Sequence, residues 1–336
     1  DGSLICCSYI RGFRENWTLR LLRADDPTRQ FALTDPGQAM YAPAWSPDGR
    51  YIACTGYRAG DPGWGIYVVD AATGLSQRLD VGPGNCRSPV WSPDGTRLVF
   101  ESNREGSYYL FSAEVPELEF GTVTPFPDNA AVLSLAFDPQ GDAVQETSGY
   151  ANELRVAGAP AIGTDGITFG PGEFIAAERP EGLDFGEGQF AVSANITLRE
   201  VTGQVQIIAV GDYPQHSQGW QLYVGDEGYL WFNSRNEEGT FVGARSDTPL
   251  VPGKRLSAVG LRRDAGGVEL WIDGVPQQTS RGGADMRYEA ANQVRIGSQY
   301  SGGMDFAGTL HALSILDVAP SPEALRAPHL EEFVRQ

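Results

Sequence analysis

A thirteen-residue stretch that occurs twice constrains the fold of this chain more than any other feature. Residues 42–54 read Ala-Pro-Ala-Trp-Ser-Pro-Asp-Gly-Arg-Tyr-Ile-Ala-Cys, and residues 88–100 read Ser-Pro-Val-Trp-Ser-Pro-Asp-Gly-Thr-Arg-Leu-Val-Phe. In each copy a short apolar run leads into Ser-Pro-Asp-Gly, where glycine suits the positive φ of a tight turn. A β-rich run follows. The stretch therefore predicts a strand, a turn and a second strand, made twice.

The copies return at a fixed interval. Trp45, Trp91 and Phe137 are 46 residues apart, and a period in the forties with four strands per unit is typical of propeller blades. The expected strands are 3–10, 17–23 and 29–34 in the first unit, 42–45, 50–56, 64–70 and 75–80 in the second, and 88–91, 96–102, 107–113 and 120–126 in the third. Residues 131–137 are expected to open a fourth unit.

The second half of the chain changes texture and shows no 46-residue return. Its apolar residues alternate at period two, which predicts strands. These runs are 190–198, 204–210, 220–224, 229–233, 255–263, 268–273, 293–297 and 308–316. Antiparallel strands without intervening helices indicate a sandwich or jelly roll. The fold class is therefore all-β: three propeller repeats of about 46 residues, forming an incomplete ring, followed by an antiparallel jelly-roll β-sandwich.

These patterns divide the chain into four parts. We expect propeller blades over 1–147, a linker over 148–161, a jelly roll over 162–320 and a helical tail over 321–336. Ser321 suits the helix N-cap and Pro322 its first position. The apolar residues of the tail are expected to pack on the sandwich; they are Leu325, Leu330 and Phe333.

Two families resemble these halves. Trp-Ser-Pro-Asp-Gly at 45–49 and 91–95 resembles the WD40-like repeat of TolB-type propellers, called PD40, and the resemblance covers roughly 1–147. The second half is similar to laminin-G-like, concanavalin A-like jelly rolls over about 162–320. Four stretches carry that similarity: 180–194, 219–224, the Asp-Gly hairpin at 267–274 and the closing strand at 306–315. It implies that Trp220, Trp231 and Trp271 are core residues.

A closed propeller needs at least about four blades, and the sequence holds three units plus one opening strand. Three explanations are open: further blades precede Asp1 in a longer chain, two chains complete one ring as a homodimer, or 131–137 supplies the missing strand of the first unit. The chain begins at Asp1 without Met or a visible signal peptide, so we favour a piece of a longer protein.

Charge and cysteine usage limit the partners and the compartment. A formal net charge of −18 argues against nucleic acid and anionic membranes, and no apolar run is long enough to span a bilayer. Cys6, Cys7, Cys54 and Cys86 show no metal spacing and suit small buried hydrophobes. The compartment is left open between the cytoplasm, as part of a larger protein, and a secreted or periplasmic location.

The sequence offers no catalytic constellation. It lacks the Gly-x-Ser-x-Gly elbow of serine hydrolases and a phosphate-binding glycine loop. The three histidines are His216, His311 and His329, and none has a second ligand at zinc spacing. Paired carboxylates on one strand, as glycosidases use, are not evident. We therefore expect no enzyme activity and no cofactor.

Binding residues are sought in the loops. Sugar recognition uses aromatic platforms with polar partners. Six loop residues of the jelly roll fit that chemistry, namely Tyr213, Arg235, Asn236, Tyr288, Gln299 and Tyr300. In the propeller, Arg58 and Trp64 lie in the longer loop 56–65 and are expected to be exposed.

A calcium site is a further possibility in the jelly roll. Asp212, Asp226, Glu227 and Asp305 lie in expected loops and carry the oxygen ligands that Ca²⁺ prefers. Turn chemistry and surface charge explain them equally well. The similar family often carries Asp-Glu at its closing strand, where this chain has Leu310-His311. A family calcium site would therefore lack those two residues here.

The resulting hypothesis is a non-catalytic recognition protein. The propeller acts as a scaffold or protein-interaction surface, and the jelly roll binds a glycan or a protein. Two alternatives stay open: the C-terminal sensor arm of a larger signalling or defence protein, and the accessory region of a secreted carbohydrate-active enzyme.

Overall fold

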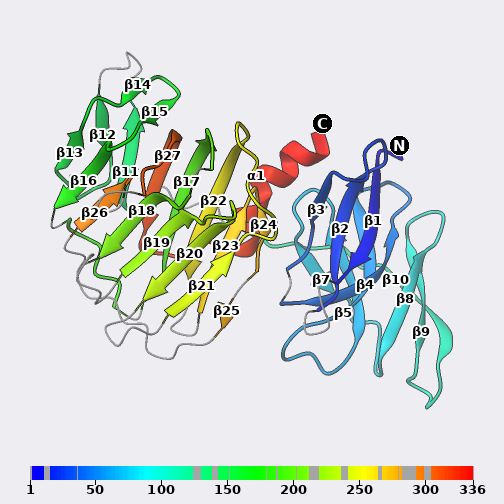
Figure 1. The fold of residues 1–336 in the computed structure, drawn as a ribbon. Coiled ribbons are helices and arrows are strands. Elements are labelled where there is room, and N and C mark those ends of the chain that lie inside the picture. Colours follow the sequence, from blue (N-terminus) through cyan, green and yellow to red (C-terminus); the bar gives the residue numbers. More distant parts are fainter. Residues whose placement is uncertain are drawn as a thin grey trace. The chain divides into compact units, whose positions relative to one another are not determined.

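A computed structural model describes most of the chain (Figure 1). The described residues are 2–10, 16–35, 37–123, 130–137, 143–150, 152–178, 180–186, 188–201, 203–211, 219–235, 241–263, 267–278, 280–281, 293–298 and 304–335. The chain forms two compact units, Asp1–Phe126 with Ser321–Gln336, and Pro127–Pro320. The architecture is all-β with one short helix, and it combines propeller blades with a jelly-roll sandwich, as the sequence predicts.

The first unit contains three antiparallel sheets that recur about every 46 residues; Ile5 and Leu22 of the first sheet correspond to Ile52 and Val69 of the second. The first blade has β1 (Leu4–Tyr9), β2 (Thr18–Arg23) and β3 (Gln30–Ala32), and the second has β4 (Ala39–Trp45), β5 (Tyr51–Tyr57), β6 (Gly65–Asp70) and β7 (Ser76–Arg78). The third has β8 (Cys86–Trp91), β9 (Arg97–Ser102) and β10 (Tyr109–Glu114). The repeat is therefore a true structural unit, and within the described residues the second blade shows all four strands.

Each Ser-Pro-Asp-Gly turn is closed by its own side chains. The Ser92 hydroxyl donates to Oδ1 of Asp94 at 2.6 Å and accepts from the backbone N–H of Arg97 at 3.0 Å. Gly95 takes a φ of 73°, which is the left-handed region that favours glycine. The turn at 46–49 repeats these bonds. The recurring sequence is thus a self-contained hairpin turn.

The blades are held together by their apolar faces. Ala53, Ile66 and Val68 of the second blade pack against Leu98 and Phe100 of the third in one buried cluster. A blade is apolar on both faces, so it needs a neighbour on each side to bury them. The middle blade has both neighbours.

In the third blade, the described part of the expected fourth strand, residues 120–123, is not a strand. Among residues 115–123, no strand is present; Phe120 instead stacks on Tyr51 of the second blade at 5.7 Å between ring centroids. The backbone N–H of Glu119 donates to Oε1 of Gln77. The segment therefore contacts the second blade through an aromatic ring and a backbone hydrogen bond.

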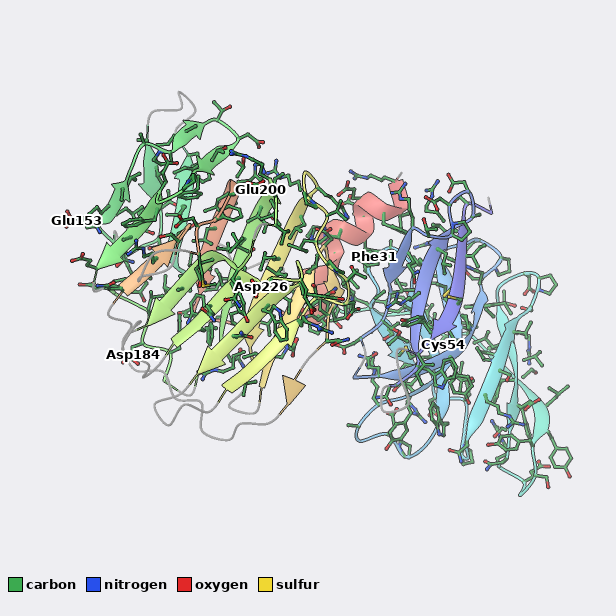
Figure 2. All side chains as sticks on the ribbon, viewed as in Figure 1. Phe31, Cys54, Glu153, Asp184, Glu200 and Asp226 are labelled. Carbon is green, nitrogen blue, oxygen red and sulfur yellow. The ribbon has the colours of Figure 1, made fainter. Side chains whose placement is uncertain are left out.

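Helix α1 (Pro322–Arg335) packs on the first unit, so the expectation that it covers the sandwich is wrong. The ring centroid of Phe333 lies 5.7 Å from that of Phe31, a β3 residue that is labelled in Figure 2. Leu330 is fully buried, and the hydroxyl of Ser321 caps the helix by accepting from the N–H of Ala324. The helix is too short and too polar to cross a membrane.

The second unit is a sandwich of two antiparallel sheets. The ten-stranded sheet contains β11 (Ala131–Phe137), β12 (Val144–Glu146), β14 (Ala161–Gly163), β15 (Gly166–Phe169), β17 (Phe190–Leu198), β22 (Arg255–Arg262), β23 (Gly267–Ile272), β24 (Val275–Pro276), β25 (Ser280–Arg281) and β27 (Gly308–Leu316). The seven-stranded sheet contains β13 (Leu154–Ala157), β16 (Phe174–Glu178), β18 (Val205–Gly211), β19 (Gly219–Val224), β20 (Leu230–Arg235), β21 (Phe241–Arg245) and β26 (Gln293–Ile296). Inward-facing side chains from both sheets form one continuous core.

β11 corrects the expectation of a fourth blade. It pairs with β27 of the sandwich, where Ser134 and Ser314 share a hydroxyl hydrogen bond at 3.0 Å, and with β12. Val132 and Leu133 are buried in the sandwich core. An opening strand without the rest of its blade leaves its apolar face uncovered, and β27 provides both a backbone edge and a core for it.

The Asp-Gly hairpin expected from the family resemblance is present between β23 and β24. Asp273 and Gly274 have φ values of 49° and 73°, and Ile272 pairs directly with Val275. Two central residues with positive φ define a type I′ turn, whose twist matches that of the adjoining strands.

We predict that α1 stabilises the first unit. Replacing Phe333 by Ala should lower the free energy of unfolding by about 3–5 kcal/mol, because a buried aromatic contact is lost and a cavity remains. Val334 lies beside it on the same helix and is exposed, so Val334→Ala is a matched control that should change stability by less than about 0.5 kcal/mol. Denaturant unfolding measures both. Equal effects would contradict the helix contact.

We also predict an acid-dependent turn in the third blade. The hydrogen bond from Ser92, with further bonds from Thr96, lowers the pKa of Asp94 to about 2. A depressed folded-state pKa adds stability above the unfolded-state value near 4, and this is lost as the pH falls towards 2. Ser92→Ala should therefore raise the pKa of Asp94, as measured by NMR titration of its carboxyl carbon. If the pKa of Asp94 were the same in Ser92→Ala as in the native chain, the hydrogen bond from Ser92 would not be the cause of its low value.

Candidate functional site

The most distinctive surface of the sandwich lies on the outer side of three adjoining strands. Outward-facing side chains of β19, β20 and β21, with the residue preceding β20, form what we call the β19–β21 face. Its members are Gln221, Tyr223, Tyr229, Trp231 and Arg245, and Asn233 shares their phase but is buried. Tyr223 is the direct cross-strand partner of Trp231, which in turn pairs with Arg245. These strands lie side by side in Figure 1.

The aromatic rings of this face carry a cation. The Arg245 guanidinium lies 4.4 Å from the ring centroid of Tyr229 and 5.5 Å from that of Trp231. Tyr223, Trp231 and Arg245 are all half-buried. The alternate residues Trp220 and Phe232 point inward and belong to the core, so the core is filled without the outer rings. The face is thus a rigid aromatic platform on regular strands.

A buried polar group lies next to the platform. Asn233 is 3% exposed, and its Nδ2 donates to the Tyr223 hydroxyl at 2.9 Å, while its Oδ1 has no hydrogen-bond partner. Oε1 of Gln206, which pairs across strands with Tyr223, is likewise buried and unpaired. An unpaired buried acceptor costs about 1–3 kcal/mol, so packing alone does not account for these two amides.

The predicted loop residues lie almost entirely outside the described part of the chain. These are Asp212, Tyr213, Asn236, Tyr288, Gln299 and Tyr300. Arg235 ends β20, and only its backbone is described. Their roles therefore stay predictions.

Several of these residues follow or precede strand ends that are aligned with one another at one end of the seven-stranded sheet. Gly211 pairs with Gly219, Gly219 with Arg235, and Arg235 with Phe241. The start of β26 lies at the same end of the sheet, because Val294 pairs with Val210 near the end of β18. The strands that precede or follow the segments containing Tyr213, Asn236 and Tyr288 therefore begin or end at this same end of the sheet.

The described calcium candidates do not form a cluster. Asp226, labelled in Figure 2, and Glu227 are exposed in the turn between β19 and β20. Oδ2 of Asp305 accepts from the backbone N–H of Gly172 at 2.9 Å. Within the described ranges, no group of three or more acidic, histidine or cysteine side chains lies close enough to hold a metal ion.

The two propeller candidates differ from the expectation of exposed side chains. Trp64 is half-buried between the rings of Tyr41 and Tyr57, at centroid distances of 5.3 and 5.7 Å. Arg58 is half-buried as well; it donates to the hydroxyl of Ser76 and lies over the ring of Tyr67. Both side chains consolidate the second blade. A role in ligand binding stays a prediction for them.

His311 has partners that the sequence search missed. It is the extra residue at a bulge in β27, where the register with β17 shifts. Nε2 lies 2.8 Å from Oγ1 of Thr197, and Nδ1 lies 2.6 Å from the carbonyl oxygen of Asp165 and 3.2 Å from its carboxylate. Arg255 pairs with the same carboxylate at 2.9 Å.

This hydroxyl–imidazole–carboxylate chain resembles the order of groups in a hydrolase triad. Here, however, the nearest acceptor of Nδ1 is a backbone carbonyl, and the imidazole is only 7% exposed. The arrangement fastens the turn between β14 and β15 onto the sheet, which is a structural task. The bulge could not be found from strand alternation, because it shifts the phase by one residue.

The four cysteines are free. Cys54 and Cys86 are buried, as expected of small hydrophobes, while Cys6 and Cys7 of the first blade are half-buried. Burial raises the pKa of the Cys54 thiol to about 12 and raises that of Cys6 as well. These thiols stay protonated near neutral pH and are poor nucleophiles.

Two protein-family models match the chain. Residues 24–161 match the TolB beta propeller domain model, PD40, and residues 171–326 match the concanavalin A-like lectin/glucanases superfamily model, Laminin_G_3. The resemblance inferred from the sequence is therefore confirmed.

Curated relatives match part of the chain. The TolB homolog of Chlorobaculum tepidum is 38% identical over 79 residues, which are 24% of this chain and 18% of the relative. The Tol-Pal system protein TolB of Alcanivorax borkumensis is 39% identical over 82 residues, with the same two shares. An uncharacterized protein of Agrobacterium fabrum is 30% identical over 108 residues, 29% of this chain and 36% of the relative. The chain thus spans about a third or less of these relatives.

Solved structures share the fold at low identity. The binding domain of botulinum neurotoxin serotype D has a TM-score of 0.51 and 17% identity, covering 61% of this chain and 51% of that one. The serotype D ligand binding domain in complex with N-acetylneuraminic acid has a TM-score of 0.50 and 17% identity, covering 60% and 50%. At this identity the likeness concerns the fold alone.

We predict that His311 holds the β14–β15 turn in place. His311→Ala removes both imidazole bonds and should speed hydrogen exchange in Gly166–Phe169 by about two- to tenfold, since each bond contributes about 0.5–1.5 kcal/mol. Asp165→Asn is the matched control, because it keeps the backbone carbonyl that accepts from Nδ1, and its effect should be smaller. Hydrogen-exchange mass spectrometry compares the variants. Unchanged exchange in His311→Ala would contradict the clamp.

Proposed function

We propose that this chain is a non-catalytic recognition protein whose sandwich binds a glycan through the β19–β21 face, with the propeller blades as scaffold. The observation that carries the proposal is the pairing of an aromatic platform with unsatisfied buried amides. Tyr223 and Trp231 are adjacent on regular strands, and the nearby acceptors of Asn233 and Gln206 lack donors.

The chemistry of the face suits a sugar. Aromatic rings bind the C–H faces of a pyranose, and amide and guanidinium groups bind its hydroxyls. Arg245 adds a cation that favours sugars with a carboxylate. The fold-level likeness to a domain solved with N-acetylneuraminic acid, itself an acidic sugar, supports testing that class first.

The rigidity of the platform also supports recognition. Tyr223 is held by the hydrogen bond from Asn233, and the Trp231 ring lies against the Arg245 guanidinium. Side chains ordered in the free protein lose little conformational entropy on binding, which favours affinity. The outer rings are not required for the core, since Trp220 and Phe232 fill it.

We predict that Trp231→Ala abolishes or strongly weakens glycan binding. A central aromatic contact contributes about 1.4 kcal/mol or more, so the Kd should rise at least about tenfold. Trp17 in the first unit is 43% exposed, and Trp17→Ala is the matched control that should leave the Kd unchanged. A glycan array that includes acidic sugars selects the ligand, and calorimetry measures the Kd.

The array is run with calcium and with a chelator. Binding in either condition that Trp231→Ala weakens and Trp17→Ala does not is the expected result. If no glycan binds in either condition, the glycan proposal fails and a protein ligand becomes the leading alternative. If both variants bind as the native chain does, the ligand contacts another surface.

A further inference from the structure

Two tryptophans at equivalent positions of the repeat have different hydrogen bonding. Nε1 of Trp91 donates to the carbonyl oxygen of Ala44 at 3.0 Å, which joins the third blade to the opening strand of the second. Nε1 of Trp45, one repeat earlier, is buried and has no partner. By the repeat, its acceptor belongs to the opening strand of the first blade, and the described first blade has β1 to β3 only.

The backbone edge of β1 is open at the same place. β5 lies between β4 and β6, and β9 lies between β8 and β10. β1 pairs with β2 alone among the described strands. An unpaired strand edge presents a row of N–H and C=O groups that can accept another strand.

The exposure of β1 agrees with a missing neighbour. Ile5 is 48% exposed, whereas Ile52 and Leu98, its equivalents in the next two blades, are 0% and 1% exposed. Cys7 is half-buried, whereas its equivalent Cys54 is fully buried. Leu98 packs on the preceding blade, so the first blade is uncovered on the corresponding face as well as open at the edge of β1.

β1 nevertheless holds the position of a propeller strand. The Ser8 hydroxyl accepts from the backbone N–H of Ala42 at 3.0 Å, and the Thr55 hydroxyl accepts from that of Ser88 at 2.9 Å. Ala42 and Ser88 share a φ of 53° at the bulge of each opening strand. This hydrogen bond therefore recurs between the first and second blades and between the second and third.

We infer that the space between β1 and the Trp45 indole, which we call the β1 slot, binds an extended peptide strand patterned like β4. Such a strand pairs with the free edge of β1, carries a small residue where β4 has Ala44, and offers that residue's carbonyl oxygen to Nε1 of Trp45. The occupant is defined by this chemistry. Ala44 and Trp91 show the bond that it would form.

The inference concerns the first unit and is independent of the proposed glycan site. In this inference, the unpaired indole N–H of Trp45 donates a hydrogen bond to the bound peptide strand. The interaction combines main-chain hydrogen bonds, which are largely sequence-independent, with one indole bond and small side chains that set the register.

The test uses the whole chain and a dye-labelled peptide copying residues 39–48, Ala-Met-Tyr-Ala-Pro-Ala-Trp-Ser-Pro-Asp, with blocked ends. Fluorescence anisotropy should show saturable binding, and a peptide of the same composition in scrambled order should not bind. Trp45→Phe keeps the ring packing and removes only the N–H, so the Kd should rise about two- to tenfold, the value of one hydrogen bond.

Trp91→Phe is the matched control, because its N–H is already satisfied within the chain. It should leave the peptide Kd within about twofold, yet lower the melting temperature, whereas Trp45→Phe should leave the melting temperature unchanged or higher. Absence of saturable binding, or the same Kd for Trp45→Phe and the native chain, would overturn the inference.

Sedimentation of the native chain with and without the peptide identifies a competing occupant. A dimer that the peptide converts to monomer supports the β1 slot and shows that a second copy fills it. A dimer that persists at saturating peptide, with no change in the peptide Kd for Trp45→Phe, counts against it.

Discussion

The propeller unit depends on one constraint: a blade cannot cover its own faces. Val99 is 40% exposed in the third blade, whereas Ala53, its equivalent in the second, is fully buried by the third. Leu110 and its equivalent Ile66 differ even more, at 73% and 0%. Burial in this unit is therefore a property of neighbouring pairs of blades and not of the blade sequence. Stability in such arrays is the sum of unit and interface contributions.

The sandwich, in contrast, buries its apolar faces within one unit. Its two sheets cover each other, and β11 joins the larger sheet although its sequence follows the blade repeat. The chain then returns to the first unit through α1, where Phe333 meets Phe31. Apolar segments at the unit boundaries thus pack where a sheet edge or an apolar ring is available, whatever their position in the repeat.

Much of this fold follows from the sequence, and the exceptions have physical causes. The period of Trp45 and Trp91 located the blade strands, and the alternation of apolar residues located the strands of the sandwich. The partner of β11 could not be predicted, because an alternating strand fits any sheet with a free edge. The bulge at His311 was also hidden, since one extra residue shifts the phase that the alternation relies on.

The candidate site shows why phase is more informative than residue type. Family resemblance placed Trp220 and Trp231 together in the core, but they lie on adjoining strands in opposite phases, so only Trp220 points inward. Trp45 and Trp91 share a phase and differ instead in whether an acceptor is present. Trp231 differs from Trp220 in pointing outward, and Trp45 differs from Trp91 in lacking an acceptor for its N–H. Each of these two tryptophans therefore lies at a surface that the described chain does not cover. Those two surfaces, the β19–β21 face and the β1 slot, are where binding by this protein is most sharply tested.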